Sequence, residues 1–242
     1  MKKVKLLRSP GKWARFWGDY ARYAKGAEGG PFPASLADAY PILSDWSKKA
    51  GSTGGHYFLQ DLWMARRIFA ARPQRHVDIG SRIDGFVAHL LVFMPVELVD
   101  IRPLPSTVSG LSFTQDDATR LGTFADNSVE SLSSLHAAEH FGLGRYGDPV
   151  DPQACFKFMD ALARVLAPGG RLYFSVPVGR QRVEFNAHRV FAPRTVLDSF
   201  PTLELRAFAA IDDAGVLREQ ARPDDVAGAD FACGLFEFGK RG

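Results

Sequence analysis

The stretch HVDIGSRIDGF, residues 76–86, decides the fold of this chain. A short apolar run ends in an acidic residue, Asp78, turns on Gly80 and leads into a helical pattern. Doubly wound α/β folds build a nucleotide pocket in this way, at the start of a helix. A second apolar run, residues 96–99, ends at Asp100, where an acidic side chain accepts hydrogen bonds from the hydroxyls of a ribose. The two runs together predict a nucleoside-binding site.

Helix patterns and strand patterns alternate along the rest of the chain. We expect helices from His56 to Ala71, from Gly85 to Pro95, from Asp151 to Pro168 and from Pro193 onward, and strands at residues 76–79, 96–99, 111–114, 129–135, 171–176, 203–211 and 231–238. Strands that alternate with helices predict a mostly parallel sheet, and the last two strands predict an antiparallel C-terminal edge. The predicted fold class is therefore α/β, a doubly wound, Rossmann-like sheet with a helical extension at the N-terminus.

Two of these helices carry specific signals. One face of the helix at residues 56–71 carries four side chains at helical spacing: Phe58, Leu62, Ala65 and Phe69. Pro73 ends that helix just before the first strand. The pair Asp151-Pro152 predicts the N-cap and first turn of the later helix.

The composition is that of an ordinary globular protein. The 242 residues are 46% hydrophobic and 24% charged, which argues against disordered and fibrous classes. No apolar run approaches the ~20 residues that a membrane-spanning helix needs. Cys155 and Cys233 fall in an apolar helix pattern and an apolar strand pattern, without a neighbour at metal-ligand spacing. We interpret them as buried thiols in a reducing cytoplasm.

Positive charge is concentrated at the start of the chain. Residues 1–26 hold eight basic residues and one acidic residue, and Trp13, Trp17 and Tyr20 recur there at helical spacing. A basic amphipathic helix binds an anionic membrane surface, meets an anionic substrate or packs on its own domain, and these alternatives stay open. It lacks the continuous apolar centre of a signal peptide.

The domain prediction follows from this composition. We expect a helical extension and linker at residues 1–50 and a Rossmann-like domain at residues 51–242. The expected location is cytoplasmic, with the basic helix allowing peripheral contact with the inner membrane.

Four segments in matching order resemble the class I S-adenosylmethionine-dependent methyltransferases, over about residues 56–240. The sequence VDIGS at residues 77–81 is similar to the family's acidic-glycine turn, and Asp100 is placed like its ribose-binding acid. The sequence DDA at residues 116–118 is similar to the adenine-binding segment. SLHAAEH at residues 134–140, followed by RVLAPGGRL at residues 164–172, resembles the remaining signatures.

The resemblance implies S-adenosylmethionine as cofactor. It places the cofactor against Asp78, Gly80, Ser81, Arg82, Gly85, Asp100, Ile101, Asp116, Asp117, Ala118 and Leu135. His56 and Tyr57, at the start of the first core helix, either close over the carboxylate end of the cofactor or pack at the helix start.

A closer resemblance is to an uncharacterised domain family found in bacterial and nematode polysaccharide-related proteins. GSRIDGF at residues 80–86, GHYF at residues 55–58 and CGLF at residues 233–236 carry it. This resemblance implies a glycan context. The expected acceptor is a sugar hydroxyl of a glycan or of its nucleotide- or lipid-linked precursor.

The glycine turn departs from the methyltransferase pattern. Arg82 and Asp84 stand where the family has its second and third glycines, and Gly85 comes one place late. The Arg82 side chain crowds the cofactor, points outward, or pairs with a carboxylate such as the cofactor's own. The same replacement argues against a dinucleotide such as NAD, because the glycine that admits the pyrophosphate is missing.

Methyl transfer to a hydroxyl needs an acceptor held in line and a group that removes its proton. His136 and His140 are the candidate bases, because they follow the fourth strand on the ligand side and an imidazole titrates near neutral pH. A structural hydrogen bond is the alternative for each. Further side chains expected at the acceptor lie on neighbouring loops: Glu139, Arg145, Tyr146, Asp148, Asn186, His188 and Arg189.

Three other functions are less favoured by the sequence. His136-x-x-Glu139-His140 matches the inverted zinc-protease spelling, but the surrounding methyltransferase signatures indicate coincidence, and we expect no metal. A non-catalytic nucleoside- or glycan-binding protein on the same scaffold is the rival function. Nucleic acid is not expected as a partner, because the chain lacks a base-amino methyltransferase signature and a recognisable nucleic-acid module.

Overall fold

The computed structural model describes residues 10–242. Residues 1–9, which carry four of the eight basic residues of the predicted basic start, lie outside the described residues. The chain divides into two units, Met1–Ser52 and Thr53–Gly242. Between residues 10 and 242, no helix combines the length and apolarity that crossing a bilayer requires.

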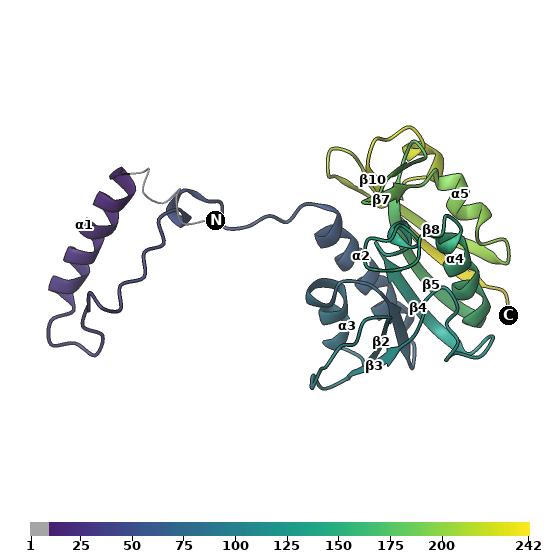
Figure 1. Cartoon of the computed structure of the whole chain (residues 1–242), viewed down its shortest axis with the longest axis horizontal. Helices are drawn as coiled ribbons and strands as arrows, with labels where there is room; N and C mark the ends of the chain where they lie inside the picture. Colours follow the sequence, from purple (N-terminus) through teal and green to yellow (C-terminus); the bar gives the residue numbers. More distant parts are fainter. Residues whose placement is uncertain (1–9) are drawn as a thin grey trace. The chain divides into compact units, whose positions relative to one another are not determined.

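Helix α1 (Pro10–Gly26) is the main element of the first unit and is drawn in purple in Figure 1. The rings of Trp13 and Trp17 stack with their centres 6.4 Å apart, so the predicted aromatic stripe forms. The Arg15 guanidinium lies 4.6 Å from the centre of the Trp46 ring. A segment of its own unit therefore contacts the helix.

An eight-stranded sheet forms the centre of the second unit (Figure 1). Its strands, in spatial order, are β3 (Leu111–Gln115), β2 (Val96–Asp100), β1 (His76–Ile79), β4 (Val129–Leu135), β5 (Leu166–Val178), β10 (Ala232–Lys240), β8 (Leu203–Ile211) and β9 (Leu217–Arg218). The first five run parallel, and β10 lies antiparallel between β5 and β8. The predicted mostly parallel sheet with an antiparallel C-terminal edge is confirmed.

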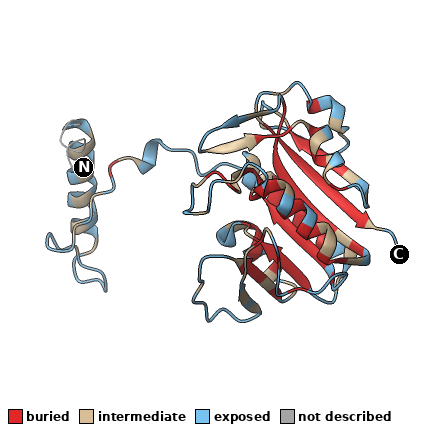
Figure 2. Ribbon diagram, turned by 45° about the vertical axis from the view of Figure 1, so that its right-hand side comes forward, coloured by how far each residue is buried: buried red, intermediate tan, exposed pale blue. Residues whose placement is uncertain are grey.

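Helices cover both faces of this sheet (Figure 1). On one face Met64 packs with Leu235, and on the other Met159 packs with Val77. The strands between these layers are red in Figure 2 because both their faces are buried, as in other parallel sheets. The remaining elements are α2 (His56–Ala71) and α3 (Ala88–Leu91) on the first face, α4 (Ala154–Val165) and α5 (Pro193–Asp198) on the second, the turns η2 (Asp45–Ser47), η3 (Ile83–Val87), η4 (Ala138–His140) and η5 (Pro223–Val226), and a hairpin of β6 (Arg182–Glu184) and β7 (His188–Val190).

The face that α2 buries coincides only in part with the one that its apolar spacing marks: Ala65 is buried. Phe58 and Phe69 are 41% and 57% exposed, whereas Ile68 is fully buried. Gln60 and Asp61 are also buried, at the end of the helix that leads into the site. Two polar side chains occupy core positions there, so apolar spacing alone did not reveal the buried face.

Two predicted boundaries are wrong. α4 begins at Ala154 rather than at the Asp151-Pro152 pair, because Asp151 belongs to a preceding turn: its carboxylate accepts from the Gln153 backbone N–H at 2.9 Å. β5 begins at Leu166 and so includes residues that the sequence assigned to the end of the helix, because Leu166 already pairs with Val129 of β4.

Candidate functional site

The carboxyl ends of three parallel strands meet at one edge of the sheet. Ile79 of β1 is paired with Val99 of β2, and Asp78 is paired with Ser133 of β4. The residues that follow these strands are therefore neighbours in space. Ligands of open α/β sheets bind at this edge, where the chain connections diverge to opposite sides.

The turn after β1 is held by the carboxylate of Asp78. This side chain is fully buried and accepts from the Ser81 backbone N–H at 3.1 Å, the Ser81 Oγ at 2.6 Å and the Ser133 Oγ at 2.5 Å. Burial raises the pKa of Asp78 to about 6, although these hydrogen bonds oppose the shift. Gly80 has a φ of 70°, which a residue with a side chain rarely adopts. Asp78 thus fixes the turn from inside the core.

His76 extends this network under the site. Its Nε2 lies 2.8 Å from the Ser133 Oγ and its Nδ1 lies 2.8 Å from the Ser131 Oγ. Because Ser133 donates its proton to Asp78, its oxygen accepts from His76 Nε2–H, and Nδ1 accepts from Ser131. Burial lowers the pKa of His76 to about 3, so the ring is neutral.

Arg82 points outward from the turn. Its guanidinium donates to the Asp84 carboxylate at 2.9 and 3.1 Å and lies 4.8 Å from the centre of the Tyr57 ring. The side chain is 51% exposed. The guanidinium therefore lies at the mouth of the site and does not fill the turn at Gly80.

Asp100 ends β2 as predicted, but Arg102 engages both of its oxygens. The Arg102 Nε donates to Oδ1 at 3.0 Å and its Nη2 donates to Oδ2 at 2.7 Å. Burial alone would raise the pKa of Asp100, but the hydrogen bonds from Arg102 outweigh it and lower the pKa. A ribose at this position has to share the carboxylate with Arg102 or displace it.

The segment after β3 is organised by its own carboxylates. Asp116 accepts from the backbone and hydroxyl of Thr123 at 2.9 and 2.6 Å, and Asp117 accepts from those of Thr119 at 3.0 and 2.7 Å. These bonds give both acids a structural function. The neighbouring Ala118 is buried.

His136 lies in a group of aromatic side chains directly after β4. Its ring centre is 5.6 Å from that of His56 and 5.2 Å from that of Tyr57. The Cys233 Sγ lies 3.9 Å from its Nδ1. Burial first, and then the neighbouring histidines, lower the pKa of His136 to about 3. The structure therefore brings His56, Tyr57 and His136 together, and adds Cys233.

His140 and Glu139 form a second pair. The His140 Nδ1 donates to the Ala187 carbonyl at 2.8 Å, and its Nε2 lies 3.7 Å from the Glu139 Oε1. Both ring nitrogens of His140 thus face protein atoms. Burial raises the pKa of Glu139 to about 8, and its Oε2 has no hydrogen-bond partner among the described residues.

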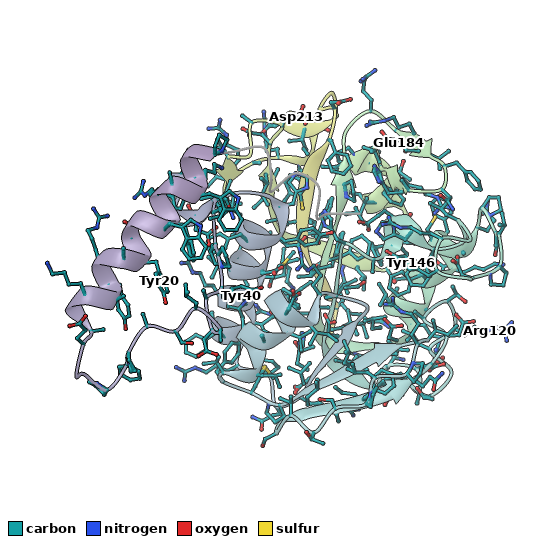
Figure 3. The ribbon with its side chains drawn as sticks, turned by 60° about the vertical axis from the view of Figure 1, so that its left-hand side comes forward. Tyr20, Tyr40, Arg120, Tyr146, Glu184 and Asp213 are labelled. Carbon is teal, nitrogen blue, oxygen red and sulfur yellow. The ribbon has the colours of Figure 1, made fainter. Side chains whose placement is uncertain are left out.

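The loop after η4 carries Tyr146, labelled in Figure 3. The Arg102 and Arg145 guanidinium groups each lie 5.2 Å from the centre of its ring, and the His140 ring centre lies 5.7 Å from it. Asp148 accepts from the Gly142 backbone N–H at 2.8 Å and so shapes the loop. Tyr146 therefore spans from the end of β2 to η4, across the mouth of the site.

We expected His188 and Arg189 on a loop, but they lie on the strand β7. The hairpin of β6 and β7 closes because three residue pairs match across it. The Arg189 Nη1 donates to the Phe141 carbonyl at 2.6 Å, and the His188 Nε2 lies 3.3 Å from the carboxylate of Glu184, also labelled in Figure 3. Arg189 therefore links β7 to Phe141, the residue that follows η4.

Five residues at the site were not predicted as site residues from the sequence, and they are Gln60, Asp61, Arg102, Phe231 and Cys233. Arg102 pairs with Asp100, two residues away, whereas Gln60 and Cys233 meet through contacts between distant segments. Gln60 links two of these segments, because its Oε1 accepts from the Ser175 Oγ at 2.6 Å and from the Cys233 thiol at 3.6 Å.

The second unit has two surface hollows of similar size. One of about 320 Å³ is lined by the C-terminal end of α2, including Phe69 and Arg72. The other, of about 290 Å³, is lined by Phe156, Gln181 and Arg189 among others. The first hollow contains no candidate site residue, whereas the candidate residue Arg189 lines the second.

One known protein family matches part of the chain. A family model described as a Caenorhabditis protein of unknown function, DUF268, matches residues 106–200, less than half of the chain. No curated protein matches the chain.

Solved structures are similar over most of the second unit. The [4+2]-cyclase SpnF has a TM-score of 0.55 at 14% identity, covering 76% of this chain and 80% of its own. The N-methyltransferase NodS from Bradyrhizobium japonicum WM9, in complex with S-adenosyl-L-homocysteine, has a TM-score of 0.54 at 15% identity, covering 75% and 86%. The 1,6-didemethyltoxoflavin-N1-methyltransferase of Burkholderia thailandensis has a TM-score of 0.54 at 14% identity, covering 96% and 91%. With its strand order and antiparallel β10, the chain has the Rossmann-like methyltransferase fold.

Proposed function

We propose that this protein is an S-adenosylmethionine-dependent methyltransferase that acts on oxygen, with a sugar hydroxyl of a glycan or glycan precursor as acceptor. One arrangement carries the proposal: the glycine turn after β1, the acid that ends β2 and the histidine that follows β4 meet at one sheet edge. The glycan part rests on the resemblance to polysaccharide-related proteins alone.

The residues present fit the cofactor. Asp78 holds the turn so that Gly80 takes its positive φ, and the Arg82 guanidinium is turned outward. The Asp100 carboxylate, at the end of the next strand, is placed to accept from ribose hydroxyls once Arg102 gives way. Arg82 and Tyr57 lie together at the mouth, where a cation and a ring suit the carboxylate end of the ligand.

Bound S-adenosylmethionine would supply a methyl group on a positively charged sulfur. The protein has to align an acceptor oxygen with that methyl group and remove the hydroxyl proton. The geometry favours His136 over His140 for contact with the acceptor, because both ring nitrogens of His140 face protein atoms. Tyr146 and Arg145 lie at the same mouth and suit a hydroxyl-rich or anionic acceptor.

The N-terminal unit would help the enzyme to use its acceptor and would not contribute to cofactor binding. Its helix carries Lys12, Arg15, Arg22 and Lys25 against one acid, Asp19, beside an aromatic stripe. Such a helix binds an anionic acceptor or an anionic membrane surface. Deleting residues 1–26 should weaken acceptor use and spare the affinity for S-adenosylhomocysteine. An equal loss of acceptor use and of S-adenosylhomocysteine affinity would reject this assignment.

A specific observation keeps a second candidate open. Arg102 occupies both oxygens of Asp100, and a protein of this fold, SpnF, is described as a cyclase. The fold thus does not by itself dictate methyl transfer. The second candidate is a non-catalytic binding protein on the same scaffold.

Calorimetric titration with S-adenosylhomocysteine separates the two candidates. The methyltransferase should bind it with micromolar affinity, and Asp100→Asn should weaken binding at least tenfold because an amide accepts hydroxyl protons less well. Arg102→Ala is the matched control, since it frees the same carboxylate and should bind as well or better. Absence of heat from folded protein at high micromolar ligand would overturn the proposal.

A further inference from the structure

Three side chains with metal-binding atoms converge beside the proposed acceptor position. His56 is the first residue of α2, His136 follows β4, and Cys233 is the second residue of β10. One ligand atom from each lies within 4.8 Å of those of the other two. We propose that His56, His136 and Cys233 form a binding site for one divalent transition-metal ion, with zinc the best match.

The donor set selects the class of ion. Two imidazole nitrogens and one thiolate suit zinc, whereas calcium and magnesium require oxygen ligands. Ligand atoms on a tetrahedral zinc ion are about 3.5 Å apart, given its usual bond lengths. The Cys233 Sγ and His136 Nδ1 are already 3.9 Å apart, so small side-chain adjustments would complete the site.

The surroundings hold each ligand in place. The His56 ring stacks on Phe231 with the ring centres 5.4 Å apart and the planes 13° apart. The backbone of Phe231 is fixed in turn, because its N–H donates to Asp213 at 2.8 Å; Asp213 is labelled in Figure 3. Cys233 is fully buried in the antiparallel strand between β5 and β8. A binding site whose ligands are held by neighbouring groups loses little entropy when the ion enters.

His136 is held through its backbone and ring. Its backbone N–H donates to the Ser175 carbonyl at 3.0 Å, and the Ser175 Oγ lies 3.5 Å from its Nδ1. The Ser175 hydroxyl itself donates to Gln60. These polar groups from β5 and α2 give the ring a fixed orientation toward the other two ligands.

A buried carboxyl group near the cluster independently points to a cation. The Oε2 of Glu139 is buried with no hydrogen-bond partner among the described residues. Glu139 lies on η4, three residues after the ligand His136. A carboxyl group in a low-dielectric interior gains from a positive charge close by. An ion held by the three ligands would supply it.

Binding has a definite proton balance. The imidazoles bind through neutral nitrogens, and the Cys233 thiol gives its proton to solvent when its sulfur binds the ion. Three protein ligands leave one position of a tetrahedral ion open, as in catalytic zinc sites.

The use of that open position rests on the proposed function. An acceptor hydroxyl bound there would lose its proton more easily. His136 would then hold the ion and would not itself take the proton.

The test uses the full chain, stripped with a chelator and titrated with Co²⁺ alone. Cobalt reports its ligands by absorption, through a thiolate charge-transfer band in the near ultraviolet and visible bands of tetrahedral geometry. We expect saturation at one ion per chain and displacement by zinc. Cys233→Ser should remove the charge-transfer band, and His56→Gln should weaken binding at least tenfold.

Matched controls exist for each ligand type. Cys155→Ser removes the other cysteine, which is buried in α4 away from the cluster, and should keep the full spectrum. His89→Gln changes an exposed histidine of α3 and should bind cobalt normally. If Cys233→Ser does not fold, His56→Gln carries the test, because His56 is only partly buried at a helix start.

Two results would overturn the site: no tetrahedral cobalt spectrum in folded protein, or an unchanged spectrum in Cys233→Ser. Titration of metal-free and zinc-loaded protein with S-adenosylhomocysteine tests the proposed function separately. Cobalt binding without S-adenosylhomocysteine binding would reject the methyltransferase and keep the metal site. Binding of S-adenosylhomocysteine without binding of cobalt would reject the metal site and keep the methyltransferase.

Discussion

Asp61 and Gly85 approach each other so closely that no side chain fits between them. A Cβ atom at residue 85 would overlap the Asp61 Oδ2, well inside van der Waals contact. Asp61 is buried on α2, and the Gln60 amide donates to its Oδ1 at 3.0 Å. Gly85, one place late for the methyltransferase pattern, therefore serves the packing of α2 against the turn η3.

Gly85→Ala should destabilise the protein by about 1–3 kcal/mol, because Asp61 has to move against its buried neighbours. Denaturant unfolding measures the loss. Gly122→Ala is the control, since open space surrounds a Cβ at that position. In the double variant Asp61→Ala/Gly85→Ala the two costs should be less than additive, and strict additivity would contradict the contact.

Glu237 should be among the most costly residues to replace. It is 1% exposed on β10, and its carboxylate is paired with Arg67 and with the Arg171 Nη1 at 2.9 Å. Hydrogen bonds to a charged group contribute about 1.5–3 kcal/mol, and water can solvate the two guanidinium groups, 35% and 40% exposed, once the carboxylate is lost. We expect Glu237→Ala to lower stability by this amount in thermal unfolding, whereas Glu204→Ala, which breaks an exposed pair with Arg241, should cost less than ~1 kcal/mol. Similar effects for the two variants would contradict this account.

Asp78 should make the protein less stable as pH rises through the acid range. Its pKa is raised from 3.8 to about 6, so the unfolded chain releases the proton first. The loss of folding stability due to Asp78 is absent below pH 4 and grows between pH 4 and 6. It levels off above pH 6, at about 3 kcal/mol. Asp78→Asn lacks this titration, so the stability difference between wild type and variant should change over that window. A difference independent of pH would show that the carboxyl group is not perturbed.

Arg82 should contact the carboxylate end of the cofactor. Its present partner, Asp84, is exposed, so the guanidinium is free to exchange partners at little cost. Arg82→Ala should weaken S-adenosylhomocysteine binding about tenfold, a loss of ~1.4 kcal/mol. Methylthioadenosine lacks the carboxylate and should bind both proteins equally. Equal weakening for both ligands would place Arg82 elsewhere in the site.

The sequence predicted the scaffold well because local patterns determine it. The apolar runs that end at Asp78 and Asp100 became neighbouring strands, and the turn at Gly80 formed between β1 and the helical segment that starts with η3. The Arg82 side chain had three alternatives, and only its contacts with Asp84 and Tyr57 distinguish outward placement. Side-chain direction depends on neighbours from other segments.

The site itself could be predicted only in part. His56, Tyr57 and His136 were candidates, and they lie together. Cys233 had no neighbour at metal-ligand spacing, because His136 and His56 precede it by 97 and 177 residues in the sequence. Likewise the pairing of Arg102 with Asp100 depends on a rotamer rather than on spacing. Contacts between distant segments leave no local periodicity.

The position of β10 sets the order in which the domain can be completed on the ribosome. β10 is the last strand of the sheet in chain order, yet in space it lies between β5 and β8. Until residues 232–240 emerge, both flanking strands present unpaired backbone groups, a template for association with other chains. Nascent chains stalled before this point should therefore depend on chaperones, and Cys233 would join the two histidines only after β10 has emerged.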